Sequence, residues 1–206
     1  MNVLLTSPEV DKITRYLRAW SKNMIKECRQ KHYYHILDKA KATRKHISGI
    51  LAKKPIDIVL LNGHGANDKI AGHNNEIIID QNNVELLQGK QIHALSCSTA
   101  KALGPMALAN GAKSYIGYDE QFVLVTQEDN LSNPLKDETA ALFLDAAFTA
   151  PKALLNGKDA ASAVAMTRAE YKNSLKKALN SDIQSDNDQF IMYLYSDMMH
   201  LKNVKA

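Results

Sequence analysis

Residues 56–67 read IDIVLLNGHGAN, and residues 91–100 read QIHALSCSTA. The first stretch begins with a nearly continuous apolar run, 56–61, and the second begins with a strand-like segment, 91–96. An apolar run of this kind is typical of a strand that is buried on both faces of a parallel sheet. The two stretches therefore predict strands inside an α/β sheet, each followed at its carboxyl end by small and polar residues.

Strands and helices alternate around these two stretches. Further strands are expected at 2–6, 33–37, 76–79 and 113–116, with 122–126 as another candidate, and helices at 11 to about 30, 40–53, 82–88 and 100–110. From residue 134 onward the pattern is helical, over 134–149, 151–156, 159–180 and 186–202. Such alternation favours an open, mostly parallel sheet with helices on both faces, followed here by a helical C-terminal part.

Length and composition limit the class of protein. The chain has 206 residues, of which 45% are hydrophobic and 23% charged, as in a single globular domain. No stretch of the sequence is apolar for long enough to span a membrane, and we expect no secretion signal. The two cysteines, Cys28 and Cys97, are too few for a disulfide framework, so a reducing, cytoplasmic location is expected.

Charge is unevenly distributed along the chain. Residues 1–54 contain 13 Lys and Arg against 4 Asp and Glu, within a net charge of +4 for the whole chain. These cations fall on predicted amphipathic helices, so we interpret them as solvated helix faces and expect no nucleic-acid partner. Residues 118–146 contain seven acids and one lysine, a local net charge of −6, which would favour a cationic substrate.

His64 and Cys97 each follow the carboxyl end of a predicted strand. Side chains at the ends of neighbouring strands can converge, because such strands lie about 5 Å apart. A histidine within reach of a cysteine can take its proton, which makes the pair suited to nucleophilic catalysis. A helix that opens after Cys97 would lower the pKa of its thiol, and the N–H groups of Gly65 and Cys97 could stabilise an oxyanion.

Each of these residues also has an ordinary structural interpretation. A lone cysteine at a strand end is more often core filling, and a His-Gly pair is common in turns. Cys28 is expected to be structural, His93 to be a core or sheet-face residue and His73 to lie in a surface loop. No CxxC or HxxxH pattern occurs, so neither a metal site nor a cofactor is expected.

The ordered segments resemble a known group of enzymes. A strand ending in Asn-Gly-His-Gly, and a later strand ending in Leu-Ser-Cys-Ser-Thr with its Cys 33 positions after the His, are similar to the caspase–haemoglobinase cysteine peptidases of clan CD. Residues 111–117 (GAKSYIG) and the segment 137–171 resemble the CHAT and gingipain branch of that group. The resemblance covers roughly residues 55–175. It implies a caspase-like three-layer α/β/α sandwich, with one CHAT-type peptidase domain over residues 1–206.

The resemblance also assigns roles to individual residues. His64 matches the catalytic histidine of the group, Cys97 the nucleophile and Gly65 the glycine beside the oxyanion. Many members have glycine three residues after the cysteine, where this chain has Ala100. For substrate binding, the resemblance points to Ser96 and to the loop 117–122, where Asp119 or Glu120 would receive a basic side chain at P1, unless both acids belong to a solvated loop.

The resulting hypothesis is a cysteine endopeptidase that forms a thioester acyl-enzyme and cleaves after a basic residue. Its partners would be a protein or peptide substrate and, in addition, a separate activating protein. The alternative is a catalytically inactive module of the same fold that binds a peptide or protein partner. A flavodoxin-like domain fits poorly, because Ser-Pro-Glu after the first strand is not a phosphate-binding loop.

Overall fold

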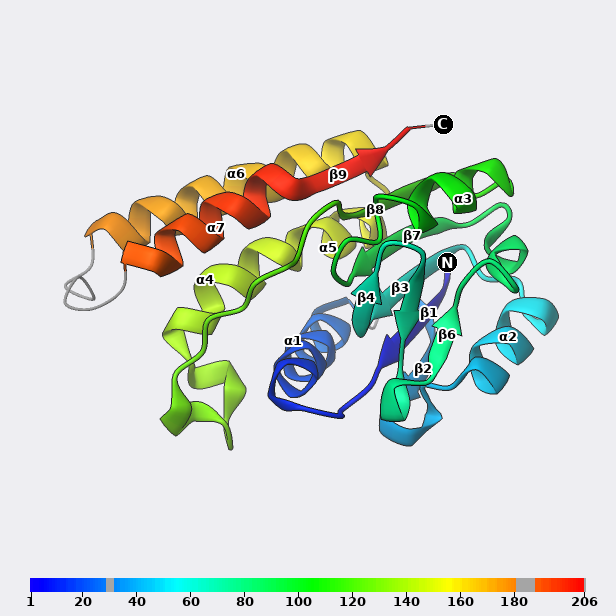
Figure 1. Cartoon of the computed structure of the whole chain (residues 1–206), viewed down its shortest axis with the longest axis horizontal. Helices are drawn as coiled ribbons and strands as arrows, with labels where there is room; N and C mark the ends of the chain where they lie inside the picture. The colour runs from blue at the N-terminus through cyan, green and yellow to red at the C-terminus, as the bar shows by residue number, and fades with distance from the viewer. Residues whose placement is uncertain (29–31, 181–187, 206) are drawn as a thin grey trace.

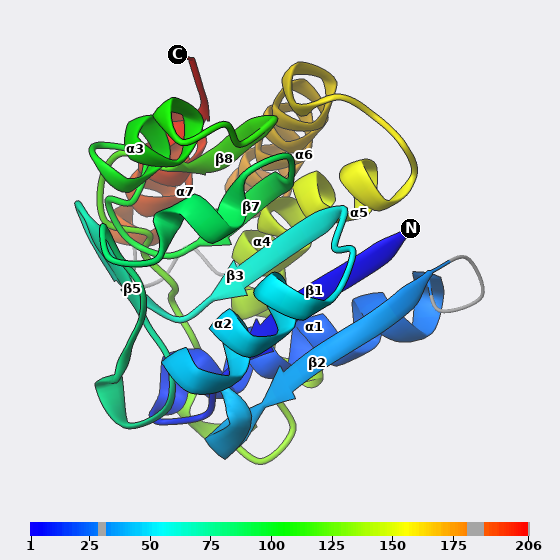
Figure 2. The same cartoon turned by 90° about the vertical axis from the view of Figure 1, so that its right-hand side faces the viewer.

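The central sheet has six strands in the order β2-β1-β3-β7-β8-β9 (Figures 1 and 2). The computed structural model describes residues 1–28, 32–180 and 188–205. The strands of this sheet are β1 (Asn2–Ser7), β2 (Tyr33–Asp38), β3 (Ile58–Asn62), β7 (Gln91–Leu95), β8 (Ser114–Tyr118) and β9 (Leu201–Val204). All neighbours are parallel except β8 and β9, which pair antiparallel. The chain is thus an α/β protein with a mostly parallel sheet, as predicted.

The two stretches that led the sequence analysis form neighbouring strands. β3 and β7 pair in parallel, and their last residues, Asn62 and Leu95, are partners in the register. Every residue of β3 is buried, and so are four of the five in β7. Because the strands end level with each other, the loops that follow them leave the same edge of the sheet.

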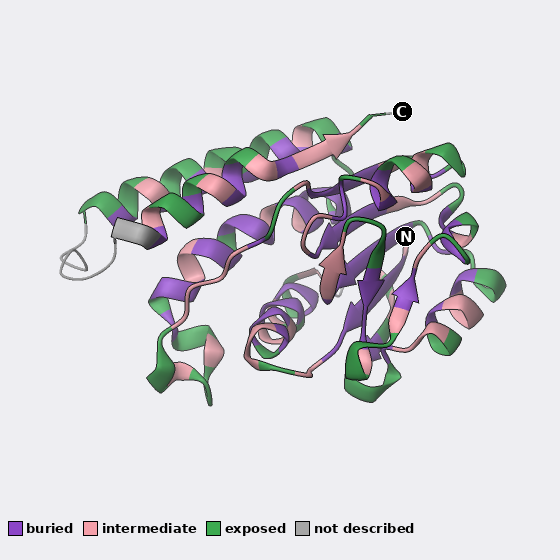
Figure 3. Cartoon of the chain, in the orientation of Figure 1, coloured by how far each residue is buried: buried purple, intermediate pink, exposed green. Residues whose placement is uncertain are grey.

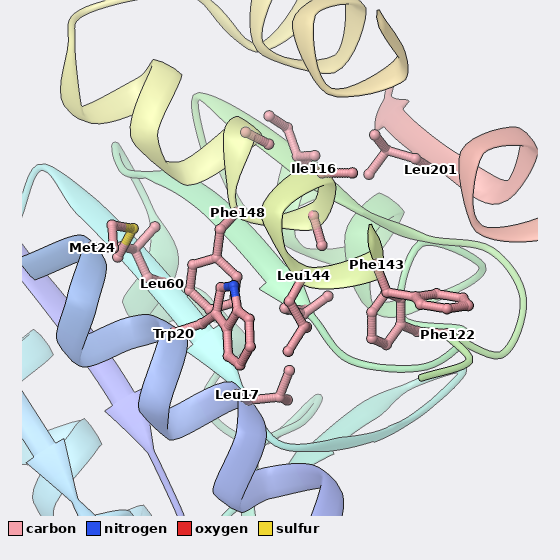
Figure 4. Packing of buried hydrophobic residues seen from close by; sticks show 14 of the residues in the cluster. Leu17, Trp20, Met24, Leu60, Ile116, Phe122, Phe143, Leu144, Phe148 and Leu201 are labelled. Carbon is pink, nitrogen blue, oxygen red and sulfur yellow. The ribbon is translucent and has the colours of Figure 1, made fainter. Parts of the chain in front are cut away.

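Helices cover both faces of this sheet. They are α1 (Lys12–Cys28), α2 (Arg44–Lys53), α3 (Leu103–Ala109), α4 (Glu138–Ala147), α5 (Thr149–Leu155), α6 (Ala160–Asn180) and α7 (Asp188–His200). Helices α1 and α4 to α7 pack on one face, where Trp20, Phe143 and Phe148 meet strand residues such as Leu60 (Figure 4). Helices α2 and α3 pack on the other face, which has its own buried cluster that includes Ile47. Buried residues therefore concentrate at the sheet and at the sides of the helices that face it (Figure 3).

A second, small sheet follows β3 directly. It consists of the antiparallel strands β4 (His64–Ala66), β5 (Lys69–Ala71) and β6 (Ile77–Ile79). The strand expected at 76–79 is therefore present, but it pairs within this small sheet and not within the main one. The first strand of the small sheet carries His64.

Several predicted elements differ from the structure. The helix expected from residue 100 begins only at Leu103, because the residues before it form turns. The last predicted helix, 186–202, ends at His200, and the chain continues as β9 because its backbone there pairs with the open edge of β8. No strand forms over 122–126, and the helix expected at 82–88 is a single 3-10 segment, Val84–Leu87. The predicted helix end near residue 30 and the helix start at 186 lie outside the described residues.

Across the described ranges 1–28, 32–180 and 188–205, no helix combines the length and the apolar character that crossing a bilayer requires.

Candidate functional site

The carboxyl end of β3 is held in place by buried hydrogen bonds. The Asn62 backbone N–H donates to the Thr6 hydroxyl, which in turn donates to the Asn62 carbonyl, both at 2.9 Å. The Asn62 side-chain amide donates to the Ser21 hydroxyl of α1 at 2.8 Å. Buried polar groups that are fully paired make a rigid support, so the chain leaves β3 in a defined direction.

Two glycines set the path of the chain that carries His64: Gly63 lies against Ala71 of β5, and Gly65 lies against Cys97. A β-carbon on Gly63 would overlap the carbonyl oxygen of Ala71, at a φ of 154°. A β-carbon on Gly65 would overlap the carbonyl oxygen of Cys97 and lie 2.7 Å from its nitrogen. The structure therefore brings the segments of His64 and Cys97 into contact. It also brings together the backbones of Gly65 and Cys97, the two predicted oxyanion donors.

Ser96 fastens these two segments together. Its hydroxyl donates to the Gly63 carbonyl at 2.9 Å, and the residue is only 2% exposed. The hydroxyl is thus engaged within the protein, so the prediction that Ser96 contacts a substrate finds no accessible side-chain group here. Its side chain positions the loop between β3 and β4.

His64 has a carboxylate partner that the sequence analysis did not identify. Its Nε2 lies 2.6 Å from Oδ2 of Asp11, and each of the two side chains is 42% exposed. The other oxygen of Asp11 accepts hydrogen bonds from the Thr14 backbone and hydroxyl, each at 2.8 Å. Burial alone would raise the pKa of Asp11, but the Thr14 hydrogen bonds and the nearby His64 together lower it. Asp11 therefore orients the imidazole from the start of α1.

The sequence analysis placed Asp11 only at the start of a predicted helix. Its partner His64 is 53 positions away, and the contact depends on how the β1–α1 loop meets the β3–β4 loop. The one available signal was position, because Asp11 lies shortly after the carboxyl end of β1 at the same sheet edge as His64.

Cys97 lies just beyond β7 and is partly buried. Its thiol donates to the carbonyl of Phe122 at 3.8 Å. Burial raises the pKa of the Cys97 thiol and the nearby Asp197 raises it further, while hydrogen bonds with the backbone of Phe122 and of Cys97 itself offset this only in part. The isolated protein thus holds this cysteine as a thiol.

The expected lowering of this pKa by a helix terminus is wrong. Helix α3 begins at Leu103, and its first N–H groups are already bonded: those of Ala102 and Leu103 donate to the Asn67 carbonyl at 3.1 and 2.8 Å. A helix terminus acts on a charge only within about its first turn. The positive end of α3 therefore interacts with the loop after β4 and not with the Cys97 sulfur.

The turn after Cys97 stores strain. Ser98 has a φ of 59°, in the left-handed region that is costly for a residue with a β-carbon. Its N–H donates to the Glu120 carbonyl, and the Ala100 N–H donates to the Tyr118 carbonyl, both at 2.9 Å. These bonds fasten the turn to the chain that follows β8. Ala100, the position where the resembling family often has glycine, is not at positive φ.

Asp119 and Glu120, the predicted selectors of a basic side chain, already contact histidine and lysine side chains of the chain itself. Asp119 contacts Nδ1 of His200 at 2.7 Å and Nζ of Lys202 at 3.3 Å. Glu120 contacts Nζ of Lys101 at 2.7 Å. A basic substrate group would have to displace or share these partners, since both oxygens of Asp119 and one oxygen of Glu120 are already in contact with them.

A third acid near Cys97 has a vacant acceptor. Asp197 of α7 is fully buried; its Oδ1 accepts from the Val123 N–H at 3.0 Å, and its Oδ2 has no hydrogen-bond partner among the described residues. Burial raises the pKa of Asp197 well above the usual range, and Asp197 in turn raises the pKa of Cys97 and of Tyr118. The sequence signal that could have found it is an acid inside an apolar helical run, Tyr-Ser-Asp-Met-Met.

The remaining candidates are structural or peripheral. His93 is 1% exposed, and burial lowers its pKa to about 3, as expected for a neutral core residue. His73 begins a 3-10 segment, His73–Asn75, and Cys28 ends α1. No three His, Cys, Asp or Glu side chains of the described part of the chain lie together as metal ligands would.

No protein-family model matches this chain, and a comparison with curated proteins finds no relative of it. The chemistry of the site is therefore inferred from its own geometry.

Proposed function

We propose that this chain is a cysteine endopeptidase that uses His64 and Cys97 as a catalytic dyad. The observation that carries the proposal is the contact between the two strand-end segments, together with the Asp11 carboxylate at 2.6 Å from the His64 imidazole. A nucleophile, a base and a residue that orients the base are the three parts that this chemistry requires.

In this mechanism His64 removes the proton of the Cys97 thiol as the sulfur attacks the scissile carbonyl carbon. The carbonyl oxygen becomes an oxyanion that the N–H groups of Gly65 and Cys97 stabilise. The C–N bond then breaks, the leaving amine takes the proton from His64, and a thioester remains on Cys97. Water, deprotonated by His64, attacks this thioester and releases the carboxylic acid and the thiol.

The arrangement also supports the finer proposal of a caspase-like, CHAT-type peptidase domain over residues 1–206. Its support is the parallel pair β3 and β7, with the histidine after one strand and the cysteine after the next. A reducing, cytoplasmic setting would keep Cys97 reduced, and this chemistry needs a cysteine that is not oxidised.

The geometry favours a resting state that needs activation. A thiol with a raised pKa is a poor nucleophile until a base takes its proton, and Asp119 and Glu120 are closed off by ion pairs. Binding of a substrate or of a separate activating protein would supply the missing change.

We further propose that substrates carry a basic residue at P1, with Asp197 as its acceptor. Among the three acids, Asp197 has a buried carboxylate oxygen without a hydrogen-bond partner in the described part of the chain, and it lies near enough to Cys97 to raise the pKa of its thiol. Because Asp197 is fully buried, binding would have to expose this oxygen before a substrate could reach it. A guanidinium or ammonium group brought beside Cys97 would pair with that oxygen and stabilise its ionised form. Asp119 and Glu120 remain the competing selectors.

The test of the dyad is cleavage of fluorogenic peptides that differ at P1, including Arg, Lys, Asp and Leu. We expect cleavage by the wild-type protein to be lost in Cys97→Ala and in His64→Ala but kept in Cys28→Ala, which removes the other cysteine. Turnover that survives Cys97→Ala would overturn the proposal.

The test of the selector compares Asp197→Asn, Asp119→Asn and Glu120→Gln on the same peptides. A charge-assisted hydrogen bond contributes about 1.5–3 kcal/mol, so we expect Asp197→Asn to lower kcat/KM for Arg peptides by about 10- to 150-fold and the other two variants to change it little. The largest loss in Asp119→Asn or Glu120→Gln would instead assign selection to that acid.

A second candidate function is a non-catalytic module that uses the same site to hold a peptide. The raised pKa of the Cys97 thiol favours it, because a binding protein needs no thiolate. Iodoacetamide alkylation from about pH 5 to 9, with and without peptide, separates the two. Alkylation that accelerates at neutral pH when peptide is bound supports the peptidase, and a thiol that stays unreactive with every peptide supports the module.

A further inference from the structure

A groove of about 460 Å³ is lined by residues of α1 and of the segment that leads towards α4. Its basic side carries Arg15, Arg18, Lys22, Lys26 and Lys39. Its other side carries residues 131–135, of which Leu131, Pro134 and Leu135 are apolar and Ser132 and Asn133 are polar. We call it the α1 groove. Its volume falls in the range of natural ligand sites, and its two sides have different chemistry.

The α1 groove keeps positive charge that the protein does not neutralise. Three of its cations share its single carboxylate, Glu9, and one of them, Arg18, also pairs with Asp38 at 2.6 Å. Lys22 and Lys26 have no carboxylate within 4.0 Å among the described residues. Like charges four residues apart, such as Lys22 and Lys26, destabilise a helix by about 0.2–0.5 kcal/mol. A bound anion would offset this repulsion.

The two sides of the groove are locked to each other. Asp137, which is fully buried, accepts hydrogen bonds from the Gln127 N–H and from the Tyr16 hydroxyl of α1, both at 2.7 Å. Its other oxygen caps α4 through the Ala140 N–H at 2.8 Å. The loop that carries the apolar side is thus closed at its base and tied to the basic side. A groove held open in this way binds without a large ordering cost.

We propose that the α1 groove binds an extended peptide segment of a protein partner in which acidic and apolar residues alternate. Lys22 and Lys26 are one helical turn apart, about 6 Å along α1. In an extended chain, side chains on the same side repeat every second residue, about 6.6 Å. Acids at alternate positions therefore match the lysines, and the residues between them face Leu131 and Leu135.

This two-sided character favours a peptide over a nucleic acid. A phosphate backbone calls for cations and hydrogen-bond donors along its path, whereas the second side of the α1 groove offers two exposed leucines, Leu131 at 36% and Leu135 at 49% exposure, beside the polar Ser132 and Asn133. The Arg15 N–H donates to the Asp11 carbonyl at 3.1 Å, so the groove begins one turn from the partner of His64. The inference goes beyond the proposed peptidase activity and does not depend on it.

The test is fluorescence anisotropy with a fluorescein-labelled peptide of six alternating Glu and Leu residues. The protein is the full chain carrying Cys97→Ala. Because this variant cannot cleave the peptide through Cys97, the measured anisotropy reports binding alone. We expect saturable binding that weakens as salt is added. Peptides with Lys in place of Glu, or Ser in place of Leu, should bind at least about tenfold more weakly.

Matched variants locate the binding. Lys22→Glu/Lys26→Glu should weaken binding at least about tenfold, and the milder Lys22→Gln/Lys26→Gln should weaken it less while keeping the fold. Lys172→Glu/Lys176→Glu, the same change at the same spacing on exposed α6 positions, should have no effect. Equal binding by all three variants would overturn the proposal, as would a single-stranded oligonucleotide that binds more tightly than the peptide and displaces it.

Discussion

Asp11 combines two functions in one side chain. One oxygen caps α1 through Thr14, and the other lies 2.6 Å from the His64 imidazole. Asparagine is as good a helix cap as aspartate but carries no charge. Substitution of Asp11 by asparagine therefore keeps the cap of α1 and removes the negative charge beside the His64 imidazole.

We expect Asp11→Asn to lower kcat by about 10- to 150-fold with little change in KM or in melting temperature, because it removes one charge-assisted hydrogen bond. Steady-state kinetics and thermal unfolding measure both effects. Asp159→Asn is the matched control, since Asp159 caps α6 through the Ser162 N–H at 2.7 Å and has no histidine partner. An Asp11→Asn variant with wild-type kcat would show that the contact is only structural.

His93 makes the stability of the protein depend on pH. Burial lowers its pKa from 6.5 to about 3, so below pH 6.5 the unfolded chain binds a proton that the folded chain does not. The contribution of His93 to the free energy of unfolding therefore has its full value above pH 6.5, the pKa of this residue in the unfolded chain. It decreases as the pH falls from there towards the lower pKa of His93 in the folded protein.

Between pH 7.5 and pH 5 we expect the wild-type free energy of unfolding to fall by about 2 kcal/mol through His93 alone. His93→Leu should remove that part of the fall, as measured by urea unfolding at both pH values. His35→Leu, on the edge strand β2, is the control and should leave the fall in place. The same pH dependence in all three proteins would contradict this account of His93.

At the scale of secondary-structure elements, the contact between β4 and the end of β7 depends on the absence of one side chain. A β-carbon at Gly65 would overlap the Cys97 backbone, whereas a β-carbon at Gly49, inside α2, would meet nothing within 4 Å. The same substitution at these two sites should therefore have opposite effects.

We expect Gly65→Ala to push β4 away from Cys97, which would abolish peptide cleavage and lower the melting temperature. Gly49→Ala should raise stability by about 0.5–1 kcal/mol, the usual gain inside a helix, and leave cleavage unchanged. Both effects can be read from thermal unfolding and from the fluorogenic assay. Normal cleavage by Gly65→Ala would show that the contact between the two segments is not needed.

Elements whose sequence pattern is local were predicted well. β1, β3 and β7 are short apolar runs, so their burial between two helix layers is encoded in their own residues. β9 was missed because Leu-Lys-Asn-Val has no strong strand pattern, and it forms only where β8 leaves an edge open. The helix expected at Ala100 starts late because the carbonyl of Asn67, far from it in sequence, takes the first N–H groups.

The same distinction applies to the candidate site. The placement of His64 and Cys97 at one edge of the sheet could be predicted, because each lies two residues beyond the end of a strand and a parallel sheet brings such residues together. Asp11 and Asp197 could not, because their contacts with His64 and Val123 span 53 and 74 residues and depend on loop packing. The pairing of Asp119 with His200 escaped prediction for the same reason, since it spans 81 residues.

At the scale of the whole molecule, the sheet separates two buried clusters that share its strands. Phe143 of α4 belongs to one cluster and Ile47 of α2 to the other. Alternate residues of β1 serve the two sides, with Val3 and Leu5 in the first cluster and Leu4 in the second. Neither helix layer can therefore unfold without exposing the shared sheet.

We expect Phe143→Ala to cost about 3–5 kcal/mol and Ile47→Ala about 2–5 kcal/mol, and each to shift the same single unfolding transition. Urea unfolding followed by tryptophan fluorescence, from Trp20 on the first side, and by circular dichroism gives the comparison. If Ile47→Ala separated the two signals into distinct transitions, the chain would contain two independently folding parts.

The position of β9 has a consequence for protein synthesis. Cys97 leaves the ribosome 100 residues before Asp197, an interval of roughly 5–20 s at ordinary rates of translation. Throughout that time Val123 lacks its carboxylate partner, Asp119 lacks His200, and β8 has an open edge. A nascent chain thus exposes Cys97 first and receives the groups that organise the neighbouring loop last. If the chain is a peptidase, this order of synthesis delays its activity until α7 and β9 have been made.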